Sequence, residues 1–500
     1  MTSEAIWIFA DQLGDHFLDP DFDGPVILIE SHAALRRRTY HRAKAHLILS
    51  ALRHRARDLG ERAMFVTADT YRAGLKQALD TLGMKPEQVI VRAPTSHPAR
   101  RLVADLGVQV SPSRGFIATE GEFTDWASGR KRLVLEDFYR MMRRTTGVLM
   151  DGAEPVGDRW NLDTDNRQPP PRRQSTLGLP EPWWPVEDEI DEQVRRDLDR
   201  WQMEGTIVTL GADGPRRFAA TVDEANAALV DFVTHRLAEF GPYEDAVMAS
   251  DWVMAHSLLS APLNLGLLDP RDAIDQVEQA YRSGSVPLAS AEGFIRQVMG
   301  WRDYVWHLYW HLGPDYVATS NALDAQTQVP DWWQQLDADQ VSAACLSSTL
   351  ADVRDRGWAH HIPRLMILGN WALQQGFDPQ ETTDWFTRVF VDAYPWVMAA
   401  NVIGMALYAD GGVMATKPYA AGGAYIKRMT NYCGACVYKP TQRVGEGACP
   451  FTSGYWAFLH GNRDLLASNH RVAQPLRNLD RLGDIDQVVS QVQQRGSSPP

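Results

Sequence analysis

The sequence predicts an α/β domain built on a doubly wound, parallel, five-stranded sheet, followed by a larger all-α domain. Two observations predict this architecture. Residues 1–115 alternate short apolar runs with helical patterns, whereas almost all apolar periodicity after residue 215 is helical. The 500 residues, of which 44% are hydrophobic, are enough to bury two or three cores. We expect an α/β domain over residues 1–130, an interdomain linker over 131–215 and a helical domain over 216–490.

The N-terminal strands are predicted from apolar runs at residues 5–10, 26–29, 64–68, 89–91 and 108–110. The clearest helix between them covers residues 33–59. Ligands of such sheets bind at the carboxyl ends of the strands, where Asp11 and Glu30 follow the first two runs. The sequence contains neither a GxGxxG turn nor a Walker loop, so a dinucleotide held by a glycine-rich turn is not indicated.

Prolines crowd residues 151–200 and predict a long linker that cannot form one continuous helix. Within it, Asp163 and Asp165 could hold a hydrated Mg²⁺ ion. Asx-turns explain the same polar run equally well.

The C-terminal helices are predicted at residues 222–239, 273–283, 291–312, 341–356, 361–375 and 380–390. The apolar segment 393–408 is expected to be a buried helix or turn, and the tail 488–500 to be frayed. No apolar run is long enough to span a membrane. The N-terminus has no basic region typical of a signal peptide, so we expect a cytoplasmic protein in a reducing compartment.

The net charge of −13 argues weakly against a nucleic-acid partner. Two segments nevertheless depart from this balance. Residues 411–445 contain five basic and no acidic residues, and residues 130–144 contain six basic residues against two acidic ones. Such stripes could neutralise phosphates, although a solvated basic face is the alternative.

The four cysteines are too few for a disulfide scaffold. Cys433 and Cys436 share one turn and could bind one metal centre, Cys449 precedes a proline as in iron–sulfur motifs, and Cys345 lies far upstream. Structural zinc also uses four cysteines, but two isolated cysteines favour a cluster over zinc. Four unligated buried thiols remain the third possibility.

His360 and His361 are adjacent and should face different surroundings, so that one of them could donate a proton near neutral pH. A hydrogen-bonded core pair is the alternative. Ten of the 17 tryptophans follow residue 300. Core packing explains most of them, although oxidisable rings could also carry electrons to a redox cofactor.

Motifs spread along the chain add a resemblance to these patterns. They lie at residues 10–13, 121–126, 160–163, 166–169, 256–260, 292–302, 360–364, 401–405, 416–419 and 449–451. In this order they resemble the bacterial iron–sulfur group of the photolyase/cryptochrome superfamily, the prokaryotic (6-4) photolyase branch. The distant first cysteine of the set is typical of that group.

The resemblance implies three cofactors. A 6,7-dimethyl-8-ribityllumazine antenna would lie at Phe9, Ala10, Asp11 and Glu30. A non-covalent, U-shaped FAD would bind in the helical domain. Its phosphates would contact the turn of His256, Ser257, Leu258, Leu259 and Ser260. The rest of it would contact Arg296, Gln297, Trp301, Arg364, Asp392, Tyr394 and Asn401. A four-iron four-sulfur (4Fe-4S) cluster would bind Cys345, Cys433, Cys436 and Cys449.

The implied activity is light-driven repair of (6-4) pyrimidine photoproducts in UV-damaged DNA by a monomer. The proton donors would be His360 and His361, the lesion contact Tyr419 and the electron relay Trp385. The DNA contacts would be Arg159, Trp160, Asn161, Arg167 and Lys417. A cryptochrome-type photoreceptor with the same cofactors is the alternative, and a zinc-stabilised nucleic-acid-binding module a third.

Three positions depart from the pattern of the group. Ala10 replaces a glycine, Met398 stands where an acidic residue is expected near the flavin, and Phe386 follows Trp385 where a tyrosine is expected. These departures leave flavin tuning and the electron route open, and with them the choice between repair and signalling.

Overall fold

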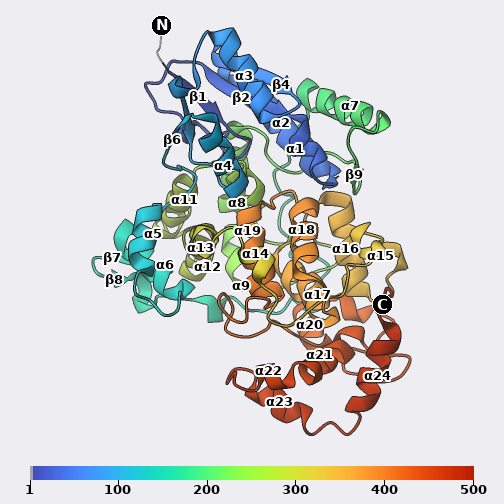
Figure 1. Cartoon of the computed structure of the whole chain (residues 1–500). Helices are drawn as coiled ribbons and strands as arrows, with labels where there is room; N and C mark the ends of the chain where they lie inside the picture. The colour runs from blue at the N-terminus through green and yellow to red at the C-terminus, as the bar shows by residue number, and fades with distance from the viewer. Residues whose placement is uncertain (1–3) are drawn as a thin grey trace.

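The computed structural model describes residues 4–500, and its N-terminal part is a five-stranded parallel sheet. The spatial order is β4-β2-β1-β5-β6, and the strands are β1 Ala5–Ile8, β2 Val26–Ser31, β4 Ala63–Ala68, β5 Val89–Arg92 and β6 Gln109–Ser111. Trp7 at the centre pairs with Ile27 and with Val91. All five predicted strands are therefore confirmed (Figure 1).

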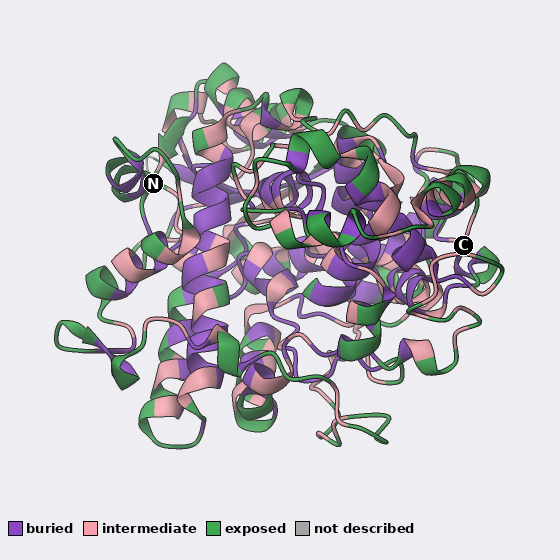
Figure 2. Ribbon diagram, turned by 90° about the horizontal axis from the view of Figure 1, so that it is seen from below, coloured by how far each residue is buried: buried purple, intermediate pink, exposed green. Residues whose placement is uncertain are grey.

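Alternation along the strands divides the core into two parts. Trp7 and Ile27 face a cluster that includes residues of α3 (Tyr71–Leu82) and α4 (His97–Leu106). Ile8 and Leu28 face α2 (Arg42–Leu59) and share one continuous core with the helical part of the chain. Buried residues accordingly fill the middle of the molecule, whereas exposed residues gather around its rim (Figure 2).

The segment predicted as a linker contains more regular structure than its prolines suggested. After α5 (Glu120–Ala127) come α6 (Leu135–Thr146) and the small hairpin β7 Met150–Asp151 with β8 Glu154–Pro155. The proline-rich stretch itself is irregular, but α7 (Glu189–Met203) follows and packs on α2. Asp188 begins α7 by accepting a hydrogen bond from the backbone N–H of Ile190, in a capping box with Asp191. Two further short strands pair in parallel, β3 Tyr40–His41 with β9 Thr209–Leu210.

The remainder is helical, as predicted. The main helices are α8 Val222–His235, α9 Leu237–Tyr243, α10 Ser260–Asn264, α11 Pro270–Arg282, α12 Leu288–Ile295, α13 Asp303–Leu312, α16 Ala344–Arg356, α17 Asn370–Gln375, α18 Pro379–Val389, α19 Pro395–Met398, α20 Gly423–Met429, α21 Pro450–Gly461 and α24 Ile485–Arg495. Over residues 4–500, none of the helices is both long and apolar enough to cross a bilayer.

Three segments are wound as π-helix: Arg296–Arg302, Pro363–Gly369 and Ala399–Ala406. Such segments are rare and often lie at functional sites. Each of the three carries residues that the sequence assigned to the flavin.

The C-terminal tail is not frayed, so that expectation is wrong. Val488 of α24 is fully buried. The Trp332 indole donates a hydrogen bond of 2.8 Å to the carbonyl of Ser497, and the backbone N–H of Ala343 donates one of 3.0 Å to Pro500. The last residues therefore pack beside the start of α16.

Candidate functional site

Asp392 is the anchor of the site predicted for the flavin. The Arg364 guanidinium binds both of its carboxylate oxygens, at 2.9 and 3.0 Å, and the Ser260 hydroxyl donates to one of them at 2.6 Å. The Asn264 amide donates to the backbone carbonyl of Asp392 at 2.9 Å. Burial opposes ionisation, but these partners hold the pKa of Asp392 below its usual value. The pair therefore fixes α10, one π-helical segment and the chain after α18 to one another.

Polar groups without partners surround this anchor. Within residues 4–500, the Tyr394 hydroxyl and the Nε2 atoms of His256 and His360 are buried and have no hydrogen-bond partner. Buried polar atoms are normally satisfied, so such atoms suit a ligand. Leu258, in the turn between His256 and Ser260, has a φ of 58°, a conformation that costs energy for a leucine.

The other predicted flavin residues lie on the π-helical segments. The Trp301 indole donates a hydrogen bond of 3.0 Å to the side-chain oxygen of Asn401 and so joins two of these segments. Arg296 is largely buried among carboxylates, whereas Gln297 is exposed. The structure thus brings Arg296, Trp301, Asn401 and the Asp392 anchor into one half of the molecule on neighbouring elements, as predicted for one cofactor site.

The two adjacent histidines differ as the sequence predicted. His360 is buried and stacks on His256, with ring centroids 4.2 Å apart. Burial and the neighbouring positive groups lower the pKa of both rings well below the usual value, so both are neutral. The side chain of His361 is 53% exposed, and its Nε2 lies 3.2 Å from the Asp245 carboxylate. His361 is therefore the member of the pair that can exchange protons with a substrate.

His361 belongs to a group of charged residues, the His361 cluster, formed with Asp163, Glu244, Asp245 and Arg296. Arg296 lies 3.0 Å from Asp163 and 3.8 Å from Glu244. Burial raises the pKa of Glu244 to about 7.

Tyr419 interacts electrostatically with Arg167, Asp163 and Asp245, and burial raises the pKa of its phenol. Tyr419 and Arg167 therefore interact with Asp163 and Asp245 of the His361 cluster.

Asp163 and Asp165 do not form an open Mg²⁺ site. Asp163 accepts hydrogen bonds from Arg296, at 3.0 Å, and from Arg167, while Asp165 pairs with Arg159 at 2.8 Å. Each carboxylate is neutralised by a guanidinium, which leaves little charge for a divalent cation. Of the predicted DNA contacts, Arg159, Arg167 and Lys417 are exposed, Trp160 is half-buried, and the Asn161 amide donates to Glu136 at 2.9 Å.

The predicted antenna residues separate into two groups. Phe9 is buried against Tyr71, with centroids 5.4 Å apart. Asp11 accepts a hydrogen bond of 2.5 Å from Thr95, and burial raises its pKa, while Ala10 is half-buried beside it. Glu30 continues the alternation of Leu28 and points to the opposite face of the sheet from Phe9. There its carboxylate forms a bidentate ion pair with the Arg53 guanidinium, at 2.8 and 2.9 Å. Glu30 and Phe9 therefore do not meet at one ligand.

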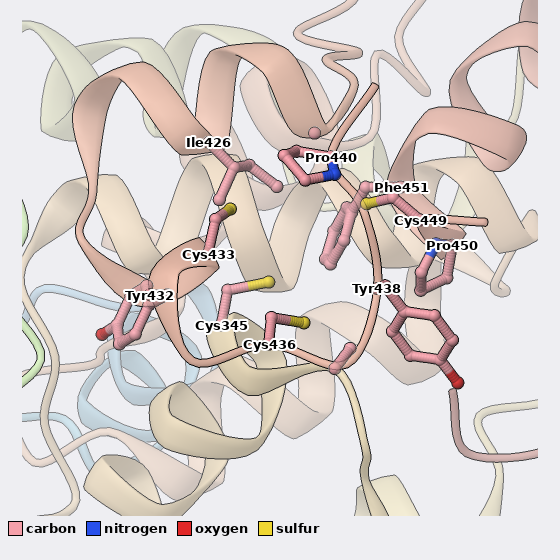
Figure 3. Close-up of a pocket in the computed structure, with 12 residues that line it drawn as sticks. Cys345, Ile426, Tyr432, Cys433, Cys436, Tyr438, Pro440, Cys449, Pro450 and Phe451 are labelled. Carbon is pink, nitrogen blue, oxygen red and sulfur yellow. The ribbon is translucent and has the colours of Figure 1, made fainter. Parts of the chain in front are cut away.

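The four cysteines converge as predicted, around a pocket that Figure 3 shows. Cys345 lies in the first turn of α16, Cys433 and Cys436 lie on one turn, and Cys449 begins α21. The other lining residues are apolar or aromatic, among them Ile426, Tyr432, Pro440 and Phe451. Gly423 leaves the space open, because a Cβ there would lie 2.8 Å from the Cys449 sulfur and 2.6 Å from the Pro440 carbonyl.

The spacing of the cysteines suits a centre larger than one ion. Burial raises the pKa of Cys433 to about 11 and that of Cys345 well above its usual value, and thiolate neighbours add to both shifts. Four free thiolates would therefore be unfavourable without a bound cation. A single tetrahedral zinc would hold its sulfurs about 3.8 Å apart. Within residues 4–500, two groups of three side chains have their potential metal-ligand atoms within 4.8 Å of one another: His256–His360–His361 and His54–Asp188–Asp191. Among the same residues, no three of the cysteine sulfurs lie that close together.

Trp385 is fully buried in a row of aromatic rings. Its centroid lies 5.1 Å from that of Trp333, which lies 5.7 Å from Trp332. On its other side Phe390 follows at 6.2 Å, and the Arg364 guanidinium lies 4.1 Å from the Phe390 ring centroid. The row connects the Arg364–Asp392 pair with Trp332, whose indole binds the C-terminal tail.

The sequence reasoning missed three residues of the site. Asp245 orients His361, Trp333 extends the ring row, and Lys44 of α2 donates to the carbonyls of Thr387, Phe390 and Ala393 at 2.7, 3.1 and 2.5 Å. No local motif marks them, because each acts across 52 to 349 residues of chain.

Comparisons with known proteins agree with this geometry. A family model described as "Deoxyribodipyrimidine photo-lyase-related protein" matches residues 6–206. The (6-4) photolyase of Agrobacterium fabrum is 39% identical over 505 residues, which cover 96% of each chain.

Two solved structures share the fold. A bacterial class III photolyase from Agrobacterium tumefaciens aligns with a TM-score of 0.57 and 18% identity over 86% of each chain. A cryptochrome from Synechocystis sp. PCC6803 aligns with a TM-score of 0.55 and 12% identity over 98% of each chain. The chain has the photolyase/cryptochrome fold and belongs, by its identity over nearly its whole length, to the same family as the A. fabrum (6-4) photolyase, the deoxyribodipyrimidine photo-lyase-related proteins.

Proposed function

We propose that this protein repairs (6-4) pyrimidine photoproducts in UV-damaged DNA by a light-driven electron transfer that requires FAD. The observation that carries the proposal is the pairing of the exposed His361 with Asp245, at 3.2 Å, beside the buried His256–His360 stack. The A. fabrum relative, 39% identical, is named a (6-4) photolyase, and this supports the same lesion.

FAD fits the residues of the Asp392 anchor. The turn from His256 to Ser260 would bind its phosphates, and the orphaned Tyr394 hydroxyl is available to a ligand. Arg364, Trp301 and Asn401 would hold the rest. When bound, FAD supplies an electron to the lesion after absorbing blue light. The protein side chains fix its position and keep it away from bulk water.

His361 holds the proton that repair of a (6-4) lesion requires. Burial opposes the ionisation of Asp245, but the hydrogen bond from His361 keeps the pKa of Asp245 below its usual value. The Asp245 carboxylate therefore accepts from Nε2 and stabilises a charged imidazole, which leaves Nδ1 to present a proton to the substrate. His360 remains neutral and supports the ring from behind. Tyr419 and Arg167 would contact the flipped-out bases and their phosphates, since removing a base from the stack must be offset by such contacts.

The cysteine pocket would bind a four-iron four-sulfur cluster. The donor set of four thiols, their spacing and the space that Gly423 leaves support it. When bound, the cluster supplies a covalent link between α16, the turn of Cys433 and Cys436, and α21. Asp11 and Phe9 support a lumazine antenna. Glu30 gives no such support, because its carboxylate is bound by the Arg53 guanidinium. The paired carboxylates of Asp163 and Asp165 do not support Mg²⁺.

Lesion choice tests the proposal. Oligonucleotides with one (6-4) product or one cyclobutane dimer are irradiated with blue light and the reduced, FAD-loaded protein, and the products are separated by chromatography. We expect intact thymines from the (6-4) strand only. Repair of the dimer alone would contradict the lesion assignment, and photoreduction of FAD with repair of neither would favour a photoreceptor.

A further inference from the structure

The face of α6 presents a basic groove that the proposed catalytic chemistry does not use. The groove, of about 460 Å³, is lined by Arg130, Arg140 and Arg144 together with Trp126, Met141 and Thr145, and by one carboxylate, Asp137. Phe138, Tyr139, Met142 and Arg143 form the buried face of the helix, so the arginines of the groove lie on its outer side.

Acidic partners neutralise two of the three arginines of this groove, and other basic groups in and beside it are left unpaired within residues 4–500. Arg140 pairs with Glu136 at 3.1 Å, and Arg130 lies 3.9 Å from Asp137. In the part of the chain that the structure describes, Arg144 and the neighbouring exposed Lys131 and Arg132 have no acidic partner within 4.0 Å. A convergence of unpaired like charges in a protein of net charge −13 complements a polyanion.

Trp160 of the linker holds these arginines in place. The guanidinium carbons of Arg140, Arg143 and Arg144 lie 5.8, 5.4 and 4.7 Å from its ring centroid. The fully buried Arg143 also donates a hydrogen bond of 3.0 Å to the Trp160 carbonyl. The exposed guanidinium groups of the groove are therefore preorganised, so less side-chain entropy is lost when they bind.

Trp160 links the groove arginines to the His361 cluster along the chain. Trp160 precedes Asp163, a member of that cluster, by three residues, which span at most about 10 Å.

We propose that the α6 groove binds the phosphodiester backbone of the duplex that flanks the lesion. The contact is to phosphates, which arginine side chains bind irrespective of the base sequence. The inference rests on the proposed function and extends it from the lesion pocket to the neighbouring duplex.

Two arginine pairs test the groove. The R140Q/R144Q variant removes two charges from it, and R196Q/R200Q removes two from α7, which lies on the opposite side of the molecule (Figure 1). K131Q/R132Q, the second groove variant, removes the two exposed basic residues that precede α6 beside the groove. Each full-length, cofactor-loaded variant is titrated with an undamaged 30-base-pair duplex over a series of salt concentrations.

R140Q/R144Q should reduce the slope of log Kobs against log salt by about 1.8 and weaken binding at least about tenfold at 0.1 M salt. K131Q/R132Q should shift both quantities in the same direction, whereas R196Q/R200Q should match the wild type. An unchanged slope and affinity in both groove variants would overturn the proposal. Repair of a (6-4) tetranucleotide, too short to reach the groove, should be unchanged in all variants. If the wild type repaired no lesion, the proposed function would be wrong. The duplex titration would still test whether the groove binds DNA.

Discussion

Lys44 donates a hydrogen bond of 3.1 Å to the backbone carbonyl of Phe390, two residues before the carboxylate that anchors the flavin site. The same ammonium group binds the carbonyls of Thr387 and Ala393, and it is buried. The N-terminal part of the chain thus supplies a donor, whose pKa burial lowers to about 7, at the carboxyl end of α18, where carbonyls lack intrahelical partners.

Replacing Lys44 by methionine should lower the free energy of unfolding by about 3 kcal/mol, because three buried carbonyls lose a charged donor. The loosened segment should also retain less FAD. Chemical denaturation and the flavin content after gel filtration measure both effects, with K76M, an exposed lysine of α3, as the control. Unchanged stability and flavin content in K44M would disprove this role.

The stability of the protein should depend on Glu244 near neutral pH. A glutamate carboxyl has a pKa of about 4.3 in an unfolded chain, whereas burial raises the pKa of Glu244 to about 7. The folded state therefore binds this proton more tightly. The resulting stabilisation, complete below about pH 4, is lost as the pH rises through 7, by at most about 4 kcal/mol.

The E244Q variant should remove that loss, so its stability relative to the wild type should increase between pH 5 and pH 8. Denaturant titrations at several pH values provide the measurement, and E239Q, on an exposed neighbour, should follow the wild type. Parallel curves for E244Q and the wild type would show that Glu244 does not titrate in this range.

Replacing His361 by alanine should abolish (6-4) repair and leave the light-driven reduction of FAD intact, because the proton donor is lost while the flavin site remains. H460A changes an exposed histidine on α21 and should repair normally. D245N should slow repair, since the imidazole loses its anionic partner. Repair by H361A at the wild-type rate would exclude His361 as the donor.

The Gly423→Ala change should cost the protein its iron. The new methyl group would lie 2.6 Å from the Pro440 carbonyl, a backbone atom that resists displacement, and 2.8 Å from the sulfur of the ligand Cys449. G434A is a matched control beside Cys433, where a Cβ meets no atom within 4 Å. Iron and sulfide are assayed together with visible absorption. Full iron occupancy in G423A, or stoichiometric zinc in the wild type, would contradict the cluster assignment.

Replacing Trp385 by phenylalanine should slow the light-driven reduction of oxidised FAD at least about tenfold, because the ring row loses its central oxidisable member. Absorbance at 450 nm during illumination follows the reaction. W456F, in α21 and outside the row, should behave as the wild type. Equal rates in W385F and the wild type would show that electrons take another route.

The sheet was predictable because each strand is a short apolar run whose period of two survives in the structure, as Trp7 and Ile8 on opposite faces illustrate. Cys433, Cys436, Cys449 and His360–His361 were predictable because their spacing is local, whereas the distant Cys345 was assigned through the resemblance. The antenna role of Glu30 stays a prediction, because its position at the end of a strand did not show which face the side chain takes or that Arg53 binds it.

The π-helical windings, the packed tail and Lys44 could not be predicted. Their causes are tertiary: Trp301 meets Asn401 across 100 residues, and Ala393 accepts from Lys44 across 349. No local pattern in the sequence carries that information.

The central claim is tested most directly by the fate of a single (6-4) lesion. An oligonucleotide carrying it is mixed with the reduced, FAD-loaded wild-type protein, and one half is exposed to blue light while the other stays dark. The account predicts that chromatography recovers the undamaged strand from the illuminated half alone. Recovery of no undamaged strand under light, by protein shown to contain FAD, would contradict it.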